Sequence, residues 1–352
     1  MQAQAYVLTA ANKPLERRTI DIPAPKAGEC IVEVDACGLC HTDLGFAQGG
    51  VLPKKGLPIV LGHEVVGRIV QAGPGEEALV GQKVLVPAVM PCGDCAFCRA
   101  GRGNACPQQK MPGNDIDGGF ATHMLVPSRP LVKIGELPST VDFRHLSVVA
   151  DAVSTAYQAV RRAALAEGDA AIIVGAGGVG GYAIQIAKAL GAKVIAIDVS
   201  DAKLEQMTKF GADKTINATG RAPKDVRKDV QAITKEWKVL SLRQRILECS
   251  GTTDGQTLAY TLVGSASTMV LVGYTPRPVE VRLSNLMAFD ATVHGTWGCP
   301  VEAYGDVLKL IYDGKVALAP FVEFAPMSKV DQIFDDMHHH RLTKRVIFDP
   351  RA

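Results

Sequence analysis

Apolar residues follow two different patterns along the chain. Up to about residue 138, short runs rich in Val and Ile, such as Ile31–Val34 and Val84–Val86, are interrupted at close intervals by Gly and Pro. Short runs broken in this way predict a β-rich region. After Asp151, a helical stretch at Ala152–Leu165 leads into strand-length apolar runs separated by helix-length amphipathic segments. This alternation predicts a parallel, doubly wound sheet, so the chain as a whole is predicted to be α/β.

The strands predicted for the second region recur at intervals that leave room for a helix between them. They are Ala171–Val174, Lys193–Ile197, Arg245–Cys249 and Thr268–Val272. From about residue 298 the chain is predicted to carry one more helix, Val301–Tyr312, then a basic turn and a terminal strand, Arg345–Phe348.

Length and composition favour a soluble protein with two cores. The chain has 352 residues, of which 47% are hydrophobic and 21% charged, a balance typical of soluble globular proteins. The net charge of +2 gives no reason to expect a nucleic-acid partner. An apolar stretch at 170–187 is interrupted by glycines, which predicts a buried strand–turn–helix rather than a membrane segment. With no signal-peptide pattern at the start, we expect a cytoplasmic protein without a membrane partner.

A glycine-rich turn follows the first predicted strand of the second region. Gly175 allows a tight turn, Gly177 lets a pyrophosphate approach the backbone, and Gly180 lets the following helix, Tyr182–Leu190, pack closely. The N-terminus of that helix offers unpaired N–H groups to phosphate oxygens. The alternative, a glycine-rich turn in a fold that binds no nucleotide, is disfavoured by this strand–turn–helix context.

Asp198 ends the next predicted strand, where an acidic side chain accepts hydrogen bonds from the adenosine ribose hydroxyls and repels a 2′-phosphate. The sequence therefore favours NAD over NADP.

Four of the nine cysteines lie within one fifteen-residue segment, as Cys92, Cys95, Cys98 and Cys106. Four thiolates match the tetrahedral sulfur coordination of a structural zinc site, which is closed to substrate. Free or iron–sulfur cysteines are the alternative, and zinc is favoured because the flanking Gly- and Pro-rich segments need a cross-link. Cysteines used in this way suit a reducing compartment.

A second candidate metal site is dispersed along the chain. Cys40 lies in the run C-H-T-D, His63 in the run G-H-E, and Asp151 near the boundary between the two regions. A thiolate, an imidazole and a carboxylate suit a three-ligand zinc with one open position. Taken alone, His63 is equally well a core histidine and Asp151 a helix N-cap, and Glu64 is an alternative third ligand.

Taken together, these blocks resemble the zinc-dependent alcohol dehydrogenase family of the medium-chain dehydrogenase/reductase superfamily, in the same order and spacing over essentially the whole chain. The resemblance implies a GroES-like catalytic domain at 1–152 and 298–352 and a Rossmann domain at 153–297. It also implies two Zn²⁺ per subunit, one catalytic and one structural, with NAD as the cofactor. The implied reaction moves a hydride between an alcohol and NAD.

The resemblance also assigns roles to individual residues. Cys40 and His63 would bind the catalytic zinc, with Cys37 only a neighbour. Thr42 would pass the alcohol proton onward, His41 would lie near the pyrophosphate, and Glu64 would approach the metal. The implied cofactor-binding positions are Gly175, Gly177, Gly178, Val179, Gly180, Asp198, Lys203, Gly273 and Arg345.

The chain departs from many family members at several positions. Asp151 stands where many carry a cysteine, which keeps the charge of the site and supplies a harder ligand. Gly45 replaces a histidine that completes the proton relay, so the exit route of the proton stays open. Ala88 replaces a large aromatic residue, which predicts room for a bulky or cyclic alcohol.

Within the family, the run with Asp151 and Gly45 resembles the 6-hydroxycyclohex-1-ene-1-carbonyl-CoA dehydrogenases of aromatic compound catabolism. Lys54 and Lys55 would then suit an acyl-CoA substrate, although a solvated charge pair explains them equally well. A general alcohol dehydrogenase stays open as an alternative.

Two other functional classes compete with this interpretation. A zinc-free quinone or enone reductase is disfavoured by Cys40, His63 and the cysteine segment, and a non-catalytic regulator would need a missing ligand. The predicted strand Ala291–Gly295 closes the Rossmann sheet with an edge that members of this family pair across a twofold axis, so the resemblance implies a homodimer or homotetramer.

Overall fold

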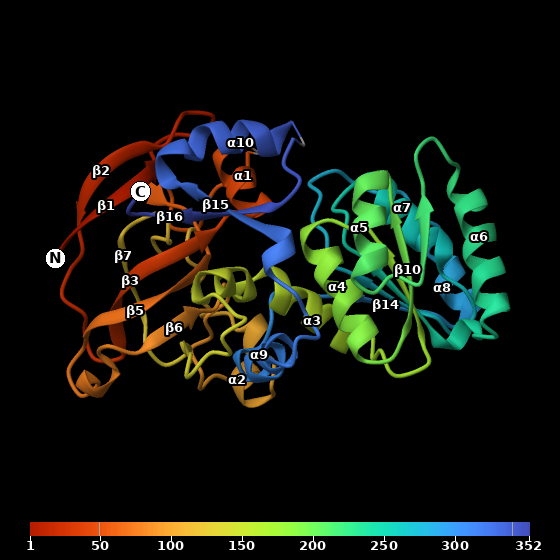
Figure 1. Cartoon of the computed structure of the whole chain (residues 1–352), viewed down its shortest axis with the longest axis horizontal. Helices are drawn as coiled ribbons and strands as arrows, with labels where there is room; N and C mark the ends of the chain where they lie inside the picture. Colours follow the sequence, from red (N-terminus) through yellow and green to blue (C-terminus); the bar gives the residue numbers. More distant parts are fainter. Residues whose placement is uncertain (49, 340) are drawn as a thin grey trace. The chain divides into compact units, whose positions relative to one another are not determined.

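The computed structural model describes residues 1–48, 50–339 and 341–352, which divide into two compact units. The first unit contains Met1–Asp151, Gly298–Tyr312 and Leu318–Ala352, and the second contains Ala152–Trp297 and Asp313–Ala317. In Figure 1 the elements of the first unit are therefore mainly red, orange and blue, whereas those of the second are mainly green. Both ends of the chain thus build one unit.

The first unit is rich in β-structure, as predicted. A three-stranded antiparallel sheet has the order β2 (Glu16–Asp21), β1 (Gln2–Leu8), β4 (Ile59–Val60). A seven-stranded sheet has the order β15 (Val322–Pro326), β16 (Arg345–Asp349), β3 (Glu29–Gly38), β5 (Glu64–Ala72), β6 (Lys83–Val86), β8 (Val132–Lys133), and β7 (His123–Pro127) also pairs with β3. Its described helices are α1 (His41–Gln48), α2 (Ala96–Arg99), α9 (Tyr304–Tyr312) and α10 (Val330–His338), with a longer 3₁₀ helix, η3, at Phe143–Ala150.

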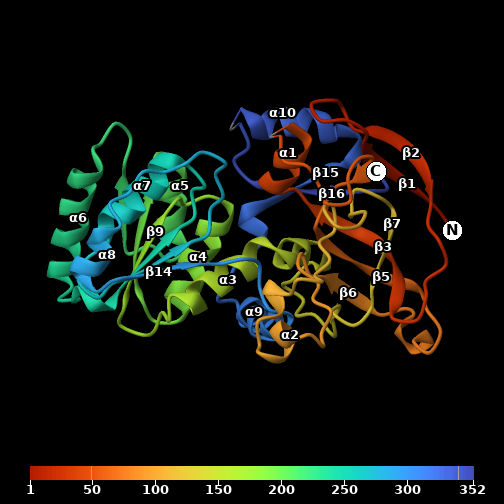
Figure 2. The same ribbon diagram turned by 180° about the vertical axis from the view of Figure 1, so that it is seen from behind.

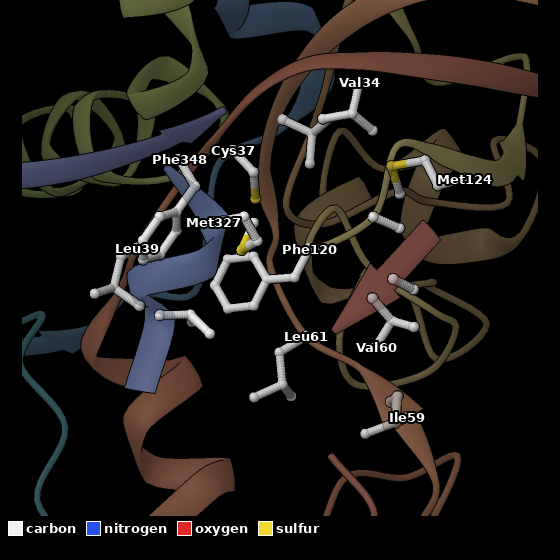
Figure 3. Close-up of a cluster of buried hydrophobic side chains, with 14 of the residues drawn as sticks. Val34, Cys37, Leu39, Ile59, Val60, Leu61, Phe120, Met124, Met327 and Phe348 are labelled. Carbon is white, nitrogen blue, oxygen red and sulfur yellow. The ribbon is translucent and has the colours of Figure 1, made fainter. Parts of the chain in front are cut away.

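The core of the first unit joins segments from both ends of the chain around Phe120 (Figure 3). The ring of Phe120 contacts that of Phe348 edge to face, with ring centroids 5.4 Å apart at 85°. Met327 and Leu39 belong to the same buried cluster. Because β16 pairs with β3 through Phe348 and Cys37, the C-terminal strand is part of the sheet that leads to Cys40.

The second unit contains one parallel six-stranded sheet in the order β11 (Lys214–Asn217), β10 (Lys193–Asp198), β9 (Ala170–Val174), β12 (Gln244–Glu248), β13 (Thr268–Leu271), β14 (Thr292–Gly295). In chain order this is 3-2-1-4-5-6, the Rossmann arrangement that was predicted. The strand order reverses between β9 and β12, and ligands of such sheets bind beyond the carboxyl ends of the strands at that point.

Helices lie on both sides of this sheet (Figures 1 and 2). They are α3 (Ala152–Arg162), α4 (Gly178–Ala189), α5 (Asp201–Lys209), α6 (Pro223–Glu236), α7 (Thr253–Leu262) and α8 (Ser284–Phe289). The short segment Asp313–Ala317 joins this unit through Gln185 of α4, whose side-chain Oε1 accepts a 2.8 Å hydrogen bond from the backbone N–H of Ala317. No helix in the described residues is long and apolar enough to cross a membrane.

The predicted elements are confirmed with corrections at their ends. The helix predicted at Ala152–Leu165 ends at Arg162, because Ala164 takes a left-handed backbone conformation with φ 48°. The strand predicted at Arg245–Cys249 runs from Gln244 to Glu248, after which the Glu248 carboxylate accepts the backbone N–H of Ser250 and begins a turn.

Two further predictions are corrected. The helix after the glycine-rich turn begins at Gly178 rather than Tyr182, and the Val301–Tyr312 helix opens with a 3₁₀ turn before α9. The segment predicted as a basic turn contains β15 and α10. The helical spacing of Val330, Ile333, Phe334 and Met337, all buried, is the signal that the prediction overlooked.

Candidate metal and cofactor sites

The four cysteines of the short segment converge in space. Their sulfur atoms are 3.5 Å apart for Cys95 and Cys98, 3.6 Å for Cys92 and Cys106, 3.7 Å for Cys95 and Cys106, and 3.9 Å for Cys92 and Cys98. Tetrahedral zinc with Zn–S bonds of about 2.3 Å places its sulfur ligands about 3.8 Å apart. The four thiols therefore fit a zinc ion.

The backbone around this cysteine lobe, residues 92–106, is held by hydrogen bonds to charged side chains. The guanidinium of Arg129 donates to the carbonyls of Gly93, at 2.9 Å, and Cys92, at 3.4 Å. The backbone N–H of Cys98 lowers the pKa of the Cys95 thiol to about 7, so one ligand is readily ionised at neutral pH. Of the four cysteines, only Cys106 is fully buried, so the lobe has little hydrophobic core of its own.

The dispersed residues Cys40, His63 and Asp151 also meet, in the first unit. The Oδ2 atom of Asp151 lies 3.6 Å from Sγ of Cys40 and 3.6 Å from Nε2 of His63. Tetrahedral zinc with bonds of about 2.0–2.3 Å places such ligand atoms about 3.3–3.5 Å apart. Nε2 of His63 is buried and makes no hydrogen bond within the described residues, which suits a metal ligand. This three-residue group therefore fits a zinc ion with one position left open.

Each of these three ligands lies at an end of a helix or strand, and the three come from different parts of the chain. Cys40 lies between β3 and α1, His63 directly precedes β5, and Asp151 joins η3 to α3. The turn before His63 requires glycine, because Gly62 has φ +96° and a Cβ there would lie 2.6 Å from the Phe120 ring. Packing of Gly62 against Phe120 thus helps to fix the backbone position of His63.

Asp43 is a functional residue that the sequence analysis did not single out. Its fully buried carboxylate accepts the backbone N–H groups of Cys40 and Gly62, each at 3.0 Å, and its Oδ1 lies 3.3 Å from Nδ1 of His63. Burial alone would lower the pKa of His63, but the carboxylates of Asp43 and Asp151 outweigh it and raise that pKa well above 6.5. A carboxylate behind a metal-binding histidine orients the ring, and the acid in the C-H-T-D run was the available signal.

Glu64 and Arg345 form a buried ion pair beside this group. Nη1 of Arg345 donates to Oε1 of Glu64 at 2.7 Å and to the carbonyl of Leu39 at 3.1 Å. Burial raises the pKa of Glu64 to about 7 against the opposing effect of the Arg345 guanidinium. Arg345, predicted to contact the cofactor, is therefore held by Glu64 and the chain just before Cys40.

The two residues that follow Cys40 are exposed in the described chain. The Thr42 hydroxyl oxygen lies 3.7 Å from Sγ of Cys40, within reach of the open position of the three-residue group. His41 is at the start of α1 on the exposed side. Gly45, in the same helix, has open space where a Cβ would stand.

The glycine-rich turn has the geometry that its sequence predicts. Gly175 has φ +93°, and a Cβ on Gly180 would lie 1.7 Å from the Gly175 carbonyl oxygen, so α4 packs on the turn only with glycine there. The Asp198 carboxylate accepts the N–H groups of Ala176, at 2.7 Å, and Val199, at 2.8 Å. Asp198 therefore also fixes the turn, a role that the sequence analysis did not predict.

The other predicted cofactor-binding residues surround this turn in the second unit. The Lys203 ammonium lies 3.8 Å from the position of a Cβ on Gly177. Gly273 packs against the backbone N–H of Gly251, just beyond β12, where a Cβ would be only 2.2 Å away. Gly178 and Val179 open α4, whose N-cap is Gly177.

Lys54 and Lys55 are engaged by carboxylates rather than left as a pair of free cations. Nζ of Lys55 lies 2.5 Å from Oδ1 of Asp117, and Nζ of Lys54 lies 3.5 Å from Oδ1 of Asp115.

Ala88 is buried, and its backbone N–H donates to the carbonyl of Ala150, the residue before Asp151, at 3.1 Å. The backbone of Ala88 thus contacts the residue that precedes Asp151.

Known domain families match both regions of the chain. The alcohol dehydrogenase GroES-like domain matches residues 26–136, and the zinc-binding dehydrogenase domain matches residues 178–313. The first match covers the segments that carry Cys40, His63 and the cysteine lobe, and the second begins at α4.

Individual relatives match over almost the whole chain. An alcohol dehydrogenase from Geobacillus stearothermophilus is 31% identical over 346 residues, 98% of this chain and 98% of that protein. An L-threonine 3-dehydrogenase from Pyrococcus abyssi (strain GE5 / Orsay) is 32% identical over 344 residues, 94% of this chain and 93% of that protein. The crystal structure of galactitol-1-phosphate dehydrogenase from Escherichia coli superposes with a TM-score of 0.85 at 26% identity, covering 99% of this chain and 100% of that one.

Proposed function

This chain belongs to the zinc-dependent alcohol dehydrogenase family of the medium-chain dehydrogenase/reductase superfamily, and we propose that it oxidises a bulky or cyclic alcohol with NAD as the hydride acceptor. Membership makes it an oxidoreductase that acts on CH–OH groups. The observation that carries the proposal is the convergence of Cys40, His63 and Asp151 at zinc-ligand distances with a hydroxyl residue beside them.

The side chains around the three-residue group have separate roles in this reaction. Cys40, His63 and Asp151 would hold a zinc ion, which when bound supplies the Lewis acidity that favours loss of the alcohol proton. Asp43 orients the His63 ring from behind. The Thr42 hydroxyl, 3.7 Å from Sγ of Cys40, accepts that proton and passes it outward. The cysteine lobe would hold the second, structural zinc.

The glycine-rich turn supports binding of a dinucleotide, and Asp198 supports NAD over NADP. The backbone N–H groups at the start of α4 would bind the pyrophosphate, and the Asp198 carboxylate would bind the ribose hydroxyls and repel a 2′-phosphate. Asp198→Ala should reduce the preference for NAD by about 10-fold or more, since that charge repulsion is lost. It should also destabilise the second unit by about 1–3 kcal/mol, because the N–H groups of Ala176 and Val199 lose their acceptor. A wild-type enzyme that turns over faster with NADP than with NAD would contradict this assignment.

For the substrate, we propose an alicyclic hydroxyacyl-CoA such as 6-hydroxycyclohex-1-ene-1-carbonyl-CoA. Ala88 supports a bulky alcohol, because its side chain is small and its backbone bonds to the residue that precedes Asp151. Lys54 and Lys55 are exposed and could exchange their aspartate partners for the phosphates of CoA. The ion pairs with Asp115 and Asp117 make this exchange a competition, so the contribution of the lysines to binding should be modest.

The test measures nicotinamide absorbance with purified protein, NAD and a matched set of substrates. The cyclic hydroxyacyl-CoA should be oxidised far faster than the free hydroxy acid or ethanol. Lys54→Ala combined with Lys55→Ala should raise KM for the thioester more than KM for a small cyclic alcohol. Lys228→Ala, which removes an exposed lysine paired with Asp225, is the matched control and should change neither. Equal turnover of ethanol and the thioester would leave a general alcohol dehydrogenase.

We further propose that the protein is cytoplasmic and forms a homodimer or homotetramer. None of the nine cysteines, all of which lie in the part of the chain that the structure describes, forms a disulfide bond, which suits a reducing compartment. Strand β14 is the edge of the second unit's sheet, and the exposed side chains of Leu283 and Met287 lie in or beside the helix that precedes it. A second copy pairing with this edge would cover them. A light-scattering mass near 37.3 kDa, that of one chain, would contradict the assembly.

A further inference from the structure

A buried tyrosine is hydrogen-bonded to the residue that precedes Asp151. Tyr304, the first residue of α9, is 1% exposed, and its hydroxyl donates to the carbonyl of Ala150 at 2.7 Å. The same carbonyl accepts the backbone N–H of Ala88 at 3.1 Å. Donors from two other segments, one of them 154 residues away in sequence, therefore fix a single peptide group.

The position of that peptide group affects the backbone position of Asp151, the next residue. Ala150 is the last residue of η3, and Asp151 has a non-helical backbone, with φ −134° and ψ −68°, before α3 starts at Ala152. Asp151 is therefore a junction between two helices rather than a residue within either one. Since η3 ends at Ala150, the contacts of that residue help to set the backbone position of Asp151.

The position of the Asp151 carboxylate depends on the peptide that carries it. Two side-chain torsions link that peptide to a carboxylate oxygen, so the oxygen reaches only a limited region around the backbone. A zinc site tolerates errors of only about 0.2 Å in its ligand distances. Anchoring of the Ala150–Asp151 peptide therefore keeps the carboxylate within reach of the metal.

We propose that Tyr304 is a positioning residue for the metal site, which holds the Ala150–Asp151 peptide so that the Asp151 carboxylate stays at ligand distance from Cys40 and His63. This inference rests on the proposed function, since it assumes that the three residues bind zinc. Tyr304 acts on Asp151 through Ala150, and it lies in α9, which follows residues 152–297 of the second unit in the chain.

The test compares loss of zinc to a chelator in Tyr304→Phe and in the wild type. Tyr304→Phe keeps the ring and removes the hydroxyl. We expect zinc to leave the three-residue site about 10-fold faster, as is typical when an outer partner of a metal ligand is lost, while the cysteine lobe keeps its zinc. With Co²⁺ in that site, the visible absorption spectrum of the variant should also shift, because the ligand geometry relaxes.

Tyr260→Phe is the matched control. The hydroxyl of Tyr260 donates to a backbone carbonyl, that of Arg282, at 2.6 Å in the second unit, so its loss tests a general cost of removing such a bond. It should leave zinc loss and the Co²⁺ spectrum unchanged.

The outcomes separate this inference from the proposed function. If the wild type binds two zinc ions and Tyr304→Phe releases neither faster, Tyr304 has no positioning role and the proposed function stands. Faster release in Tyr260→Phe to the same extent also overturns the inference, since the effect would then be general. If the wild type binds one zinc, unaffected by Cys40→Ser, the proposed function itself fails.

Discussion

The two candidate zinc sites of the first unit are built in different ways. The cysteine lobe takes four identical ligands from fifteen consecutive residues, three of these ligands being partly exposed, and the short spacing brings them close. The other group takes three different ligands from residues 40 to 151, with Cys40 and His63 buried in the core. A local site tolerates exposure because four bonds to metal stabilise it, whereas a dispersed site depends on the packing that brings its ligands together.

The largest expected effects come from removing one thiolate at each site. Cys95→Ser should lose the lobe's zinc and several kcal/mol of stability, because structural zinc contributes directly to folding. Cys40→Ser should abolish at least about 99% of activity while changing the unfolding midpoint much less, since the core around it stays packed. Zinc content, chemical denaturation and NAD-dependent turnover of both variants measure the contrast. Loss of both zinc ions in either variant would mean that the sites are coupled and the comparison is wrong.

Asp151→Asn should have the next largest effect. The amide keeps the shape of the carboxylate and removes its charge, so zinc at the three-residue site should bind about 10–100-fold more weakly and activity should fall in parallel. The lobe should keep its zinc. Asp151→Cys, which restores the ligand common among relatives, should retain zinc and serves as the matched control. If Asp151→Asn keeps full activity and zinc, Glu64 becomes the better third ligand.

A smaller effect is expected from the carboxylates beside each site. Asp43 is buried next to His63, whereas Asp94 is exposed, with its Oδ1 3.2 Å from Sγ of Cys92. Asp43→Asn should weaken zinc binding and turnover by about 10-fold, because His63 loses the partner that orients its ring. Asp94→Asn should change neither, since solvent surrounds that carboxylate. Chelator competition on both variants decides whether burial makes the difference.

The smallest expected effect concerns Glu248, a buried carboxylate that belongs to neither candidate zinc site. Glu248 is a fully buried carboxylate at the end of β12, and burial raises its pKa above 4.5 even though N–H groups of Ser250 and Gly251 partly oppose the shift. Between pH 4.5 and the raised pKa of Glu248, the folded protein therefore binds more protons than the unfolded chain. The free energy of unfolding of the wild type falls as the pH rises through this range. Glu248→Gln lacks this dependence.

The free energy of unfolding of Glu248→Gln relative to wild type should therefore increase from about pH 4.5 upward and level off above the raised pKa of Glu248. Urea denaturation between pH 4 and 8 measures the difference. A constant offset across that range would show that the Glu248 carboxylate does not titrate abnormally.

Much of the second unit could be predicted from the sequence, because its strands and helices alternate with clear periodicity. The errors occur at element ends. Nothing in the composition of Ala152–Leu165 marks the left-handed residue at 164, and the turn after Glu248 depends on that side chain reaching its own backbone. In the first unit, α10 was missed although its apolar spacing is helical, and β15 was missed because short edge strands carry little pattern.

The sequence by itself determined the features whose geometry is local. The cysteine spacing places four sulfur atoms around one point, and the glycines after β9 allow the tight turn and the close packing between strand and helix. Tertiary structure alone decided that Asp43 stands behind His63, that Arg345 pairs with Glu64, and that Tyr304 anchors the residue before Asp151. These contacts join segments tens to hundreds of residues apart, and no periodicity or spacing along the chain specifies a contact that forms only when the core packs.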